Sequence, residues 1–270
     1  MNKVVDIGSH HGEFSRHILN TSKEAFVIAV EPNPLSIPHL EKLRTEFPQR
    51  FNYVSAALTD YDGEITLTSR LINNGQLAST LNLNESFINN GHDLNSEGDQ
   101  LIVPALSVNK FLADFGLEEI EFLKIDTQGT DLKLLSLFLD NLRVKSCAVE
   151  VFGSDLESNH LYLNSKNTLR GMFSLLNNHR DYQVRKIVPA ENQNNEFNVF
   201  LVNKTFVDSN TLIEKYDIKN SRTFGRFWVT LGVGILKESR NSNFHIIMKF
   251  VRGLSHPIQS LKRLKLRLSA

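Results

Sequence analysis

The chain has 270 residues, 41% of them hydrophobic, and its 30 basic and 30 acidic residues cancel to a formal net charge of zero. That length suits one large domain, or one domain with an appendage, and it can bury a core without disulfides. A neutral chain gives no overall signal for nucleic acid or membrane, and a single cysteine, Cys147, excludes an internal disulfide. Without a signal-peptide core or an apolar stretch of about 20 residues, we expect a cytoplasmic protein.

Short β-rich runs alternate with segments of helical periodicity over most of the chain. We expect strands at residues 3–7, 25–30, 51–56, 122–126, 147–152, 182–188 and 198–202, and helices at 13–19, 35–47, 108–115, 131–140 and 168–177. Residues 64–68 predict an extra strand or hairpin arm, 101–103 are extended, and 70–100 predict a long loop with little core. The alternation predicts an α/β fold with a doubly wound, mostly parallel sheet and helices on both faces.

The first expected strand ends in a glycine motif. In a doubly wound sheet, ligands bind beyond the carboxyl ends of the strands. The motif reads D-x-G-x-x-x-G, with Asp6, Gly8 and Gly12, and has His10 where a dinucleotide motif has its middle glycine. Glycines let the backbone turn sharply and approach a ligand, and Asp6 suits a cationic ligand with an amino-acid end. An ordinary strand-to-helix turn is the alternative.

The second expected strand ends in Glu31, nineteen residues after Gly12, and Asn33 follows. An acidic residue at this point accepts hydrogen bonds from ribose hydroxyls, so we place Glu31 and Asn33 in a nucleoside-type site. The alternative is an exposed carboxylate that caps the following helix.

Charged residues also end two later strands. Lys124 and Asp126 share a face by the period of two, and a charge on a central strand needs partners at the strand end. Asp126 is either a functional acid or the N-cap of the next helix. Glu150 ends the following strand in the same way, so both carboxylates should face the mouth of a cleft.

Five segments of the chain, in order, resemble the FkbM-type methyltransferase family: VDIGSHHGEFS, AVEPNP, SAALTDYDGEITL, EFLKIDTQGTDLKLL and AVEVF. The resemblance covers about residues 3–203 and implies a Rossmann-like, seven-stranded class I fold over residues 1–204. It implies S-adenosylmethionine as methyl donor and O-methylation of a hydroxyl on a sugar, glycan or polyketide-like acceptor. It assigns Asp6, Gly8 and Gly12 to the cofactor loop, Glu31 to the ribose, Ala57 and Leu58 to the adenine, and Asp126 to the methionine end and methyl group.

The chain departs from the family pattern at three positions. His10 stands where asparagine is expected, and it can still donate a hydrogen bond to the cofactor. Asn109 stands where aspartate is usual, and Asp131 where glutamate is commoner.

Transfer to a hydroxyl calls for a group that takes its proton. We rank Asp126 first and Glu150 second, with the loop histidines, chiefly His11, in reserve. The remaining histidines show no metal-ligand spacing and no Cys/His cluster is present, so we predict no structural zinc and assign no metal ligand, which leaves a carboxylate-bound Mg²⁺ open.

Two regions lie outside these motifs. Within the long loop 70–100, we expect residues 77–82 to cover the acceptor, because long loops are often lids. Residues 205–270 predict a basic helical extension: positions 237–270 carry eight basic residues and one acidic residue, Glu238. A basic amphipathic helix can lie on an anionic membrane, and a partner-binding or self-packing helix is the alternative.

Two other functions remain open. One is a catalytically silent Rossmann-like subunit that binds a partner or a glycan, and a damaged cofactor loop would favour it. The other is an NAD-dependent oxidoreductase, against which the missing middle glycine and the KIDTQG segment count. We expect a small-molecule or glycan acceptor, and no nucleic acid.

Overall fold

A computed structural model describes residues 1–72, 75–81, 99–153, 165–189 and 196–206. The strands are β1 (Asn2–Ile7), β2 (Ala25–Val30), β3 (Phe51–Val54), β4 (Ala57–Thr59), β5 (Gly63–Ile72), β6 (Gly75–Ser79), β7 (Asp99–Ser107), β8 (Glu119–Ile125), β9 (Arg143–Phe152), β10 (Tyr182–Pro189) and β11 (Glu196–Asn203). The helices are α1 (Glu13–Thr21), α2 (Ile37–Glu46), α4 (Val108–Asp114), α5 (Asp131–Asn141) and α6 (Leu169–Asn178). No described helix is long and apolar enough to cross a bilayer.

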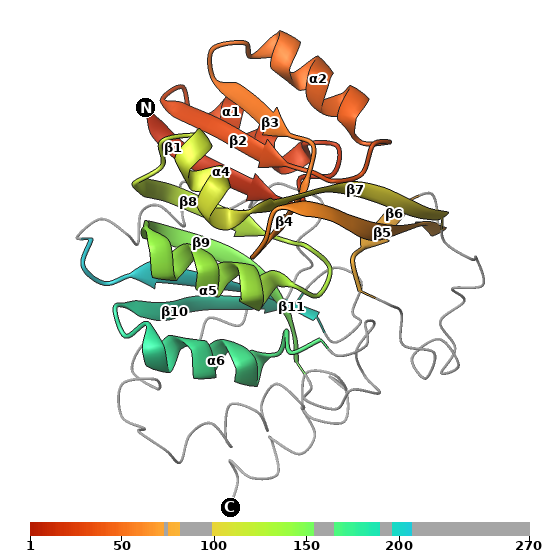
Figure 1. The fold of residues 1–270 in the computed structure, drawn as a ribbon. Helices are drawn as coiled ribbons and strands as arrows, with labels where there is room; N and C mark the ends of the chain where they lie inside the picture. Colours follow the sequence, from red (N-terminus) through yellow and green to blue (C-terminus); the bar gives the residue numbers. More distant parts are fainter. Residues whose placement is uncertain (73–74, 82–98, 154–164, 190–195, 207–270) are drawn as a thin grey trace, which may run out of the picture.

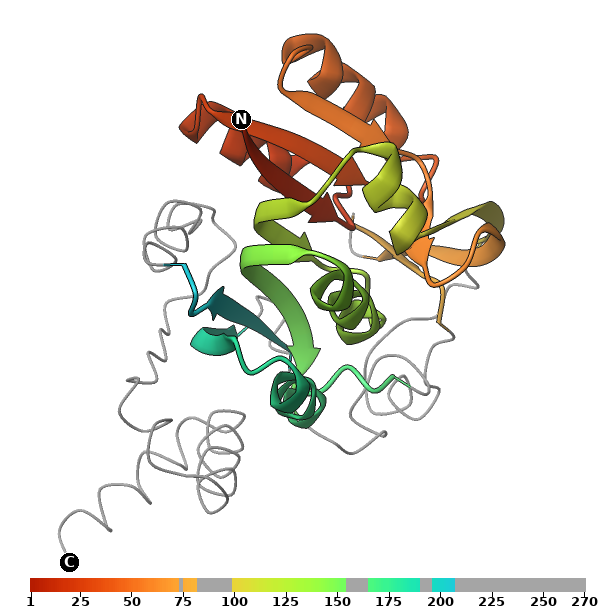
Figure 2. The same cartoon turned by 60° about the vertical axis from the view of Figure 1, so that its left-hand side comes forward.

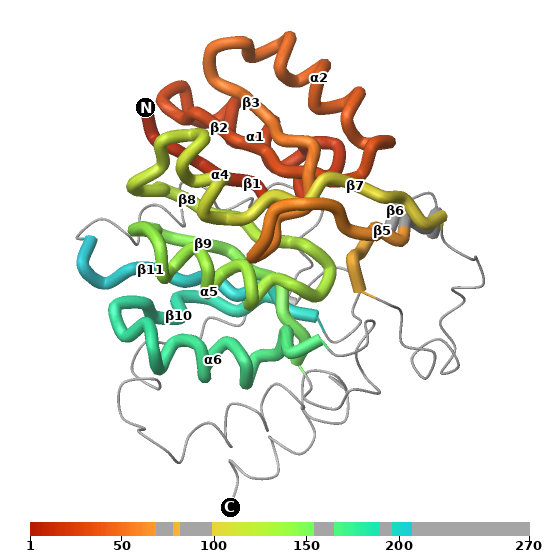
Figure 3. Tube along the Cα trace, in the orientation of Figure 1, coloured from red at the N-terminus to blue at the C-terminus, as the bar shows by residue number. Residues whose placement is uncertain are grey.

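The main sheet has seven strands in the order β10-β11-β9-β8-β1-β2-β3. Strands β3, β2, β1, β8 and β9 are parallel, whereas β11 runs antiparallel to both β9 and β10. Figure 3 follows this order from β3 at one edge to β10 at the other. The predicted seven-stranded, mostly parallel Rossmann-like sheet is therefore confirmed.

Two apolar layers cover the two faces of this sheet. On β1, the period of two sends Val4 to one layer and Val5 to the other. The layer with Val4 also holds Ile18 of α1 and Leu40 of α2, and the opposite layer holds side chains of α4, α5 and α6. Figures 1 and 2 show α1 and α5 against opposite faces, as predicted.

A second, smaller sheet has the order β4-β7-β5-β6. It corrects the prediction of a loop over 70–100, because β5 continues to Ile72, β6 spans Gly75–Ser79 and β7 begins at Asp99. Its core is small, built around Ala57, Leu67 and Val103, so these strands lack the continuous apolar runs of buried strands. Residues 82–98 lie outside the described residues.

The C-terminal extension also lies outside the described residues, apart from its first positions. Strand β11 ends at Asn203, and the description stops at residue 206. The boundary at 204, the helix in the extension and its membrane contact therefore stay predictions.

Candidate functional site

The glycine loop between β1 and α1 lies directly against the loop that follows β8. Gly8 and Gly12 have φ of 70° and 80°, a conformation that L side chains rarely adopt. A Cβ on Gly8 would lie 1.8 Å from the carbonyl oxygen of Asp126, so only glycine allows this approach. The Asp126 N–H in turn donates to the Ile7 carbonyl at 3.0 Å. Two motifs far apart in the sequence thus form one edge.

Asp6 lies behind this loop rather than on its surface. Its side chain is fully buried and accepts a hydrogen bond from the Ser15 hydroxyl at 2.7 Å. Its other oxygen lies 3.5 Å from Nζ of Lys124. Burial raises the pKa of Asp6 against the opposing attraction of Lys124. Asp6, predicted as a cofactor residue, therefore acts through the residues that it holds.

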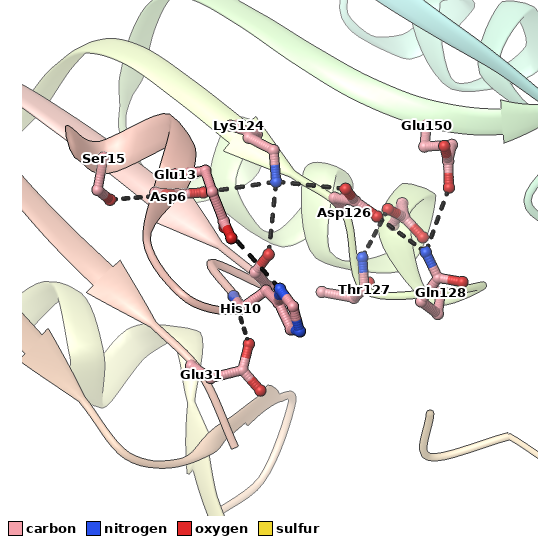
Figure 4. Close-up of polar contacts among 12 residues, drawn as sticks. Asp6, His10, Glu13, Ser15, Glu31, Lys124, Asp126, Thr127, Gln128 and Glu150 are labelled. Carbon is pink, nitrogen blue, oxygen red and sulfur yellow. Dashed lines mark hydrogen bonds and ion pairs between the residues drawn. The ribbon is translucent and has the colours of Figure 1, made fainter. Parts of the chain in front are cut away.

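Lys124 is the residue that joins the two motifs. Its ammonium lies 3.3 Å from the Asp126 carboxylate and 3.5 Å from Asp6, and it donates to the Gly8 carbonyl at 3.4 Å (Figure 4). Burial acts to lower the pKa of Lys124, but attraction to Asp126 and Asp6 outweighs it and holds the pKa above its usual value. The shared face of Lys124 and Asp126 was predicted, but Lys124 was not among the predicted site residues.

Glu31 ties the end of β2 to the glycine loop. Its two oxygens accept hydrogen bonds from the backbone N–H groups of His10, at 2.7 Å, and Asn33, at 2.9 Å. Helix α2 begins later, at Ile37, so the alternative that Glu31 caps it is wrong. Burial raises the pKa of Glu31. Asn33 is itself buried and its side-chain oxygen accepts from the Leu35 N–H, which stabilises the turn after β2.

The Asp126 carboxylate lies at the carboxyl end of β8 with 35% of its side chain exposed. It accepts a hydrogen bond from Nε2 of Gln128 at 3.0 Å. The alternative role as helix N-cap is wrong, because α5 begins at Asp131 and the cap position is Thr130.

Asp131, rather than Asp126, accepts hydrogen bonds from backbone N–H groups just before α5. Its buried carboxylate accepts from the N–H groups of Thr127 at 2.9 Å and Gly129 at 3.0 Å, and from the Asn167 side chain at 3.1 Å. Burial, with repulsion from Asp126, raises the pKa of Asp131 to about 6. The side-chain amide of Asn167 also donates to the Glu150 carbonyl at 2.9 Å, so it joins this loop to β9.

Glu150 lies beside Asp126 across the edge of the sheet. The sequence analysis predicted Glu150 at the end of its strand. Strand β9 continues to Phe152, so Glu150 lies two residues before that end. Nε2 of Gln128 lies between the two acids, 3.5 Å from Glu150 Oε2 (Figure 4). Burial, followed by repulsion from Asp126 and Glu196, raises the pKa of Glu150 well above its usual value.

Glu196 is a third acid of this edge and was not predicted. It pairs with Phe152 in the register of β11 with β9, while Asn198 pairs with Glu150, so Glu150 and Glu196 are diagonal neighbours on one face. Only 7% exposed, Glu196 has its pKa raised to about 7 by burial and by repulsion from Asp126. Because β11 is antiparallel, its first residue reaches the edge where the parallel strands end. The predicted closing pair of strands was the signal that could have found it.

The two loop histidines stack on each other. The rings of His10 and His11 are 3.7 Å apart, and the His11 ring also stacks on His39 of α2 at 3.9 Å. Contact with Glu13 raises the pKa of His10, whereas burial lowers the pKa of His11. In the described part of the chain, His11 contacts His10, His39 and Glu13, so its reserve role as base has no support from contact with Asp126 or Glu150.

The two residues predicted to flank an adenine lie in β4. Both are buried: the Leu58 side chain packs in the main core, and the Ala57 side chain in the core of the small sheet. Any contact that they make with a ligand would therefore come from their backbone.

Comparison with known proteins identifies the family. The family model for the methyltransferase FkbM domain matches residues 6–184, and no curated protein matches the chain. The similar solved structures include precorrin-6y C5,15-methyltransferase from Geobacter metallireducens GS-15 (12% identity, 74% of this chain and 79% of that one, TM-score 0.40). They also include a SAM-dependent methyltransferase from Aquifex aeolicus, with 9% identity over 74% of this chain and 82% of that one and a TM-score of 0.39. TrmK of M. capricolum in complex with S-adenosylhomocysteine has 9% identity over 96% of this chain and 90% of that one, with a TM-score of 0.39.

The chain belongs to the FkbM methyltransferase family, because the match covers more than half of its length. It is accordingly a methyltransferase whose methyl donor is S-adenosylmethionine. The glycine loop fits this cofactor: the Ser9 hydroxyl and Nε2 of His10 are buried and lack a hydrogen-bond partner in the described part of the chain. A polar ligand in the loop would satisfy both groups.

Proposed function

We propose that the protein transfers the methyl group of S-adenosylmethionine to a hydroxyl group of a sugar, a glycan or a related small molecule. The observation that supports this proposal is the partly exposed carboxylate of Asp126, which shares the Gln128 amide with Glu150 at the carboxyl edge of the sheet. A hydroxyl needs such an acceptor for its proton more than a thiol or a phenol does.

The cofactor would lie along the half of the edge formed by β1 and β2. Ser9 and His10 would hold its amino-acid end, Glu31 and Asn33 its ribose, and the backbone of Ala57–Thr59 its adenine. The bound cofactor supplies a methyl group on a sulfonium, whose leaving group is neutral. Asp6 and Lys124 hold the loop in place, and their contacts are made within the chain itself.

In this proposal Asp126 receives the proton of the acceptor hydroxyl. Gln128 and Lys124 fix the orientation of its carboxylate through contacts of 3.0 and 3.3 Å. Holding the hydroxyl in line with the methyl group accounts for much of the rate enhancement that such an enzyme needs. Glu150 is the second candidate for the base, because its pKa is raised toward the range in which a carboxylate accepts protons at neutral pH.

Charge supports a small neutral acceptor over nucleic acid. Among the described residues of this edge, Asp126, Asp131, Glu150 and Glu196 face one ammonium group, that of Lys124, and the whole chain has a formal net charge of zero. A surface that binds nucleic acid neutralises phosphates with several cations.

A transfer assay with methyl-labelled S-adenosylmethionine tests the proposal. We expect label in pools of sugars or glycans, and none in total RNA, with transfer lost in Asp126→Asn. Label in RNA or protein but not in hydroxylated small molecules would overturn the proposed acceptor. Calorimetric titration of the wild type and of Glu31→Ala with S-adenosylhomocysteine tests the proposed cofactor binding separately from the acceptor.

We also propose that the basic segment 237–270 contacts anionic membranes, on the charge of that segment alone. The cytoplasmic location stays a prediction. The full chain should sediment with anionic vesicles, and not with neutral ones, and should be released as the salt concentration rises. Equal binding to both kinds of vesicle, or to neither, would contradict the electrostatic contact.

A further inference from the structure

A cluster of two histidines and one glutamate lies on the glycine loop, beside the contacts that hold the loop to Glu31. The ligand atoms of His10, His11 and Glu13 all lie within 4.8 Å of one another. Nδ1 of His10 is 3.8 Å from one carboxylate oxygen of Glu13, and Nδ1 of His11 is 3.7 Å from the other.

A left-handed backbone brings these side chains together. In extended chain, the side chains of consecutive residues point to opposite sides. His10 has φ of 51°, unusual for a residue other than glycine, and the two rings stack at 3.7 Å with an interplanar angle of 22°. His39, from a different element, stacks on His11, so three imidazoles gather at one point.

The distances suit two ligands of one ion better than hydrogen bonds. Separations of 3.7 and 3.8 Å are too long for an N–H···O bond, which spans about 2.7–3.2 Å. Two ligands about 2.0–2.1 Å from a tetrahedral ion lie about 3.4 Å apart. The carboxylate therefore needs to move by a few tenths of an ångström. Because the two rings stack with an interplanar angle of 22°, one ring must also turn for both Nδ1 atoms to point at one ion, and the side chains of His10, His11 and Glu13, which are 40%, 35% and 70% exposed, have room to do so.

We propose that His10, His11 and Glu13 form a binding site for a divalent transition-metal ion, held by the two Nδ1 atoms and the Glu13 carboxylate, with water completing the coordination. Two imidazoles and a carboxylate are ligands for Zn²⁺, Co²⁺ and Ni²⁺, whereas Mg²⁺ and Ca²⁺ take oxygen ligands. This proposal replaces the sequence-based assignment of no metal ligand, which rested on spacing and so overlooked the conformation of His10. It is independent of the acceptor and of the base.

The site would anchor the cofactor loop. The His10 N–H donates to Glu31, and Glu13 begins α1, so an ion here would join the loop, the helix and the ribose-binding acid. An ion that binds only the folded protein also stabilises it, in proportion to the logarithm of its concentration over Kd.

The experiment is a titration of the full-length, tag-free protein with Co²⁺ and then Zn²⁺. We expect one Co²⁺ per chain with visible absorption bands, displaced by Zn²⁺ and unaffected by millimolar Mg²⁺. His11→Asn and Glu13→Gln should each weaken Co²⁺ binding at least tenfold, a loss of about 1.4 kcal/mol, while His17→Gln, on α1, should leave binding unchanged.

The two variants should fold, because these side chains are 35% and 70% exposed, and circular dichroism with S-adenosylhomocysteine titration checks this. No saturable Co²⁺ binding by the intact chain would overturn the proposal. So would binding that survives in both His11→Asn and Glu13→Gln, because the ion would then lie elsewhere.

Discussion

The acidic side chains in the two halves of the carboxyl edge of the sheet differ in their bonding partners. In the half formed by β1 and β2, Asp6 is bonded to Ser15 and lies near Lys124, and Glu31 accepts two backbone N–H groups. In the half formed by β8, β9 and β11, Asp126 and Glu150 share one amide of Gln128.

This difference indicates that the acids of one half fix the cofactor loop, whereas those of the other half can take part in proton transfer. In the second half, burial and repulsion from neighbouring acids raise the pKa values of Glu150 and Glu196. Burial raises the pKa of carboxylates in both halves, so the bonding and not the pKa separates them. Glu31, which accepts two backbone N–H groups, fixes the shape of the cofactor loop, whereas acids gathered around one amide can exchange a proton with a ligand. The first half thus suits a bound cofactor, and the second suits an acceptor that loses a proton.

Gly8→Ala should have the largest effect, because it breaks the contact between the halves. The added methyl would lie 1.8 Å from the Asp126 carbonyl, at a φ of 70°. We expect loss of measurable S-adenosylhomocysteine binding and a fall of several kcal/mol in the free energy of unfolding. The matched control is Gly116→Ala, with φ of 56° and no atom within 4 Å, which should cost only about 1–2 kcal/mol. Equal effects of the two variants would show that backbone strain, and not the contact, matters.

Asp126→Asn should separate reaction from cofactor binding. Because the amide cannot take the acceptor proton, we expect the transfer rate to fall by about 10²- to 10⁴-fold, with S-adenosylhomocysteine affinity changed less than about tenfold. Asp140→Asn, an exposed position on α5, is the control. A normal rate in Asp126→Asn would move the base to Glu150, and Glu150→Gln then provides the next test.

Lys124→Met should destabilise the fold by leaving Asp6 buried without its cation. Removal of one partner of a buried pair costs about 3–5 kcal/mol, which urea unfolding measures. If the loss comes from the uncompensated charge, adding Asp6→Asn should recover part of it. Additive losses in the double variant would mean that Lys124 and Asp6 do not interact.

The central strands and most strand-end acids were predictable, because buried parallel strands appear as continuous apolar runs. The location of Asp6 behind the loop was not, because it depends on the register that pairs Asp6 with Lys124 across β1 and β8. Glu196 was missed because the direction of β11, not its composition, brings it to the edge. Strand β6 was missed, and β7 was predicted only over residues 101–103, because a small core leaves much of such a sheet polar.

Glu196→Gln should change how stability depends on pH. The folded-state pKa of about 7 lies above the ordinary value of 4.5, so folding favours the protonated form. The contribution is fully present below about pH 4.5 and is lost as the pH rises through 7. We expect Glu196→Gln to remove a decline of about 1–3 kcal/mol in the free energy of unfolding between pH 5 and pH 8. If the free energy of unfolding of the wild type and of Glu196→Gln changes in parallel with pH, this prediction is wrong. Glu64→Gln, at an exposed position, is the control.

Arg16→Ala should have the smallest effect, although Arg16 makes a shorter ion pair than the other described ion pairs of the cofactor half. Its Nη1 lies 2.6 and 2.7 Å from the two oxygens of Glu46 and joins α1 to α2. Both side chains are about 40% exposed, so water and salt screen the attraction, and we expect a loss below about 1 kcal/mol. Urea unfolding at 50 and 500 mM salt measures it, and the loss should shrink at the higher salt concentration. A loss as large as that in Lys124→Met would mean that surface charges, and not the buried contacts of Asp6 and Glu31, hold the cofactor half together.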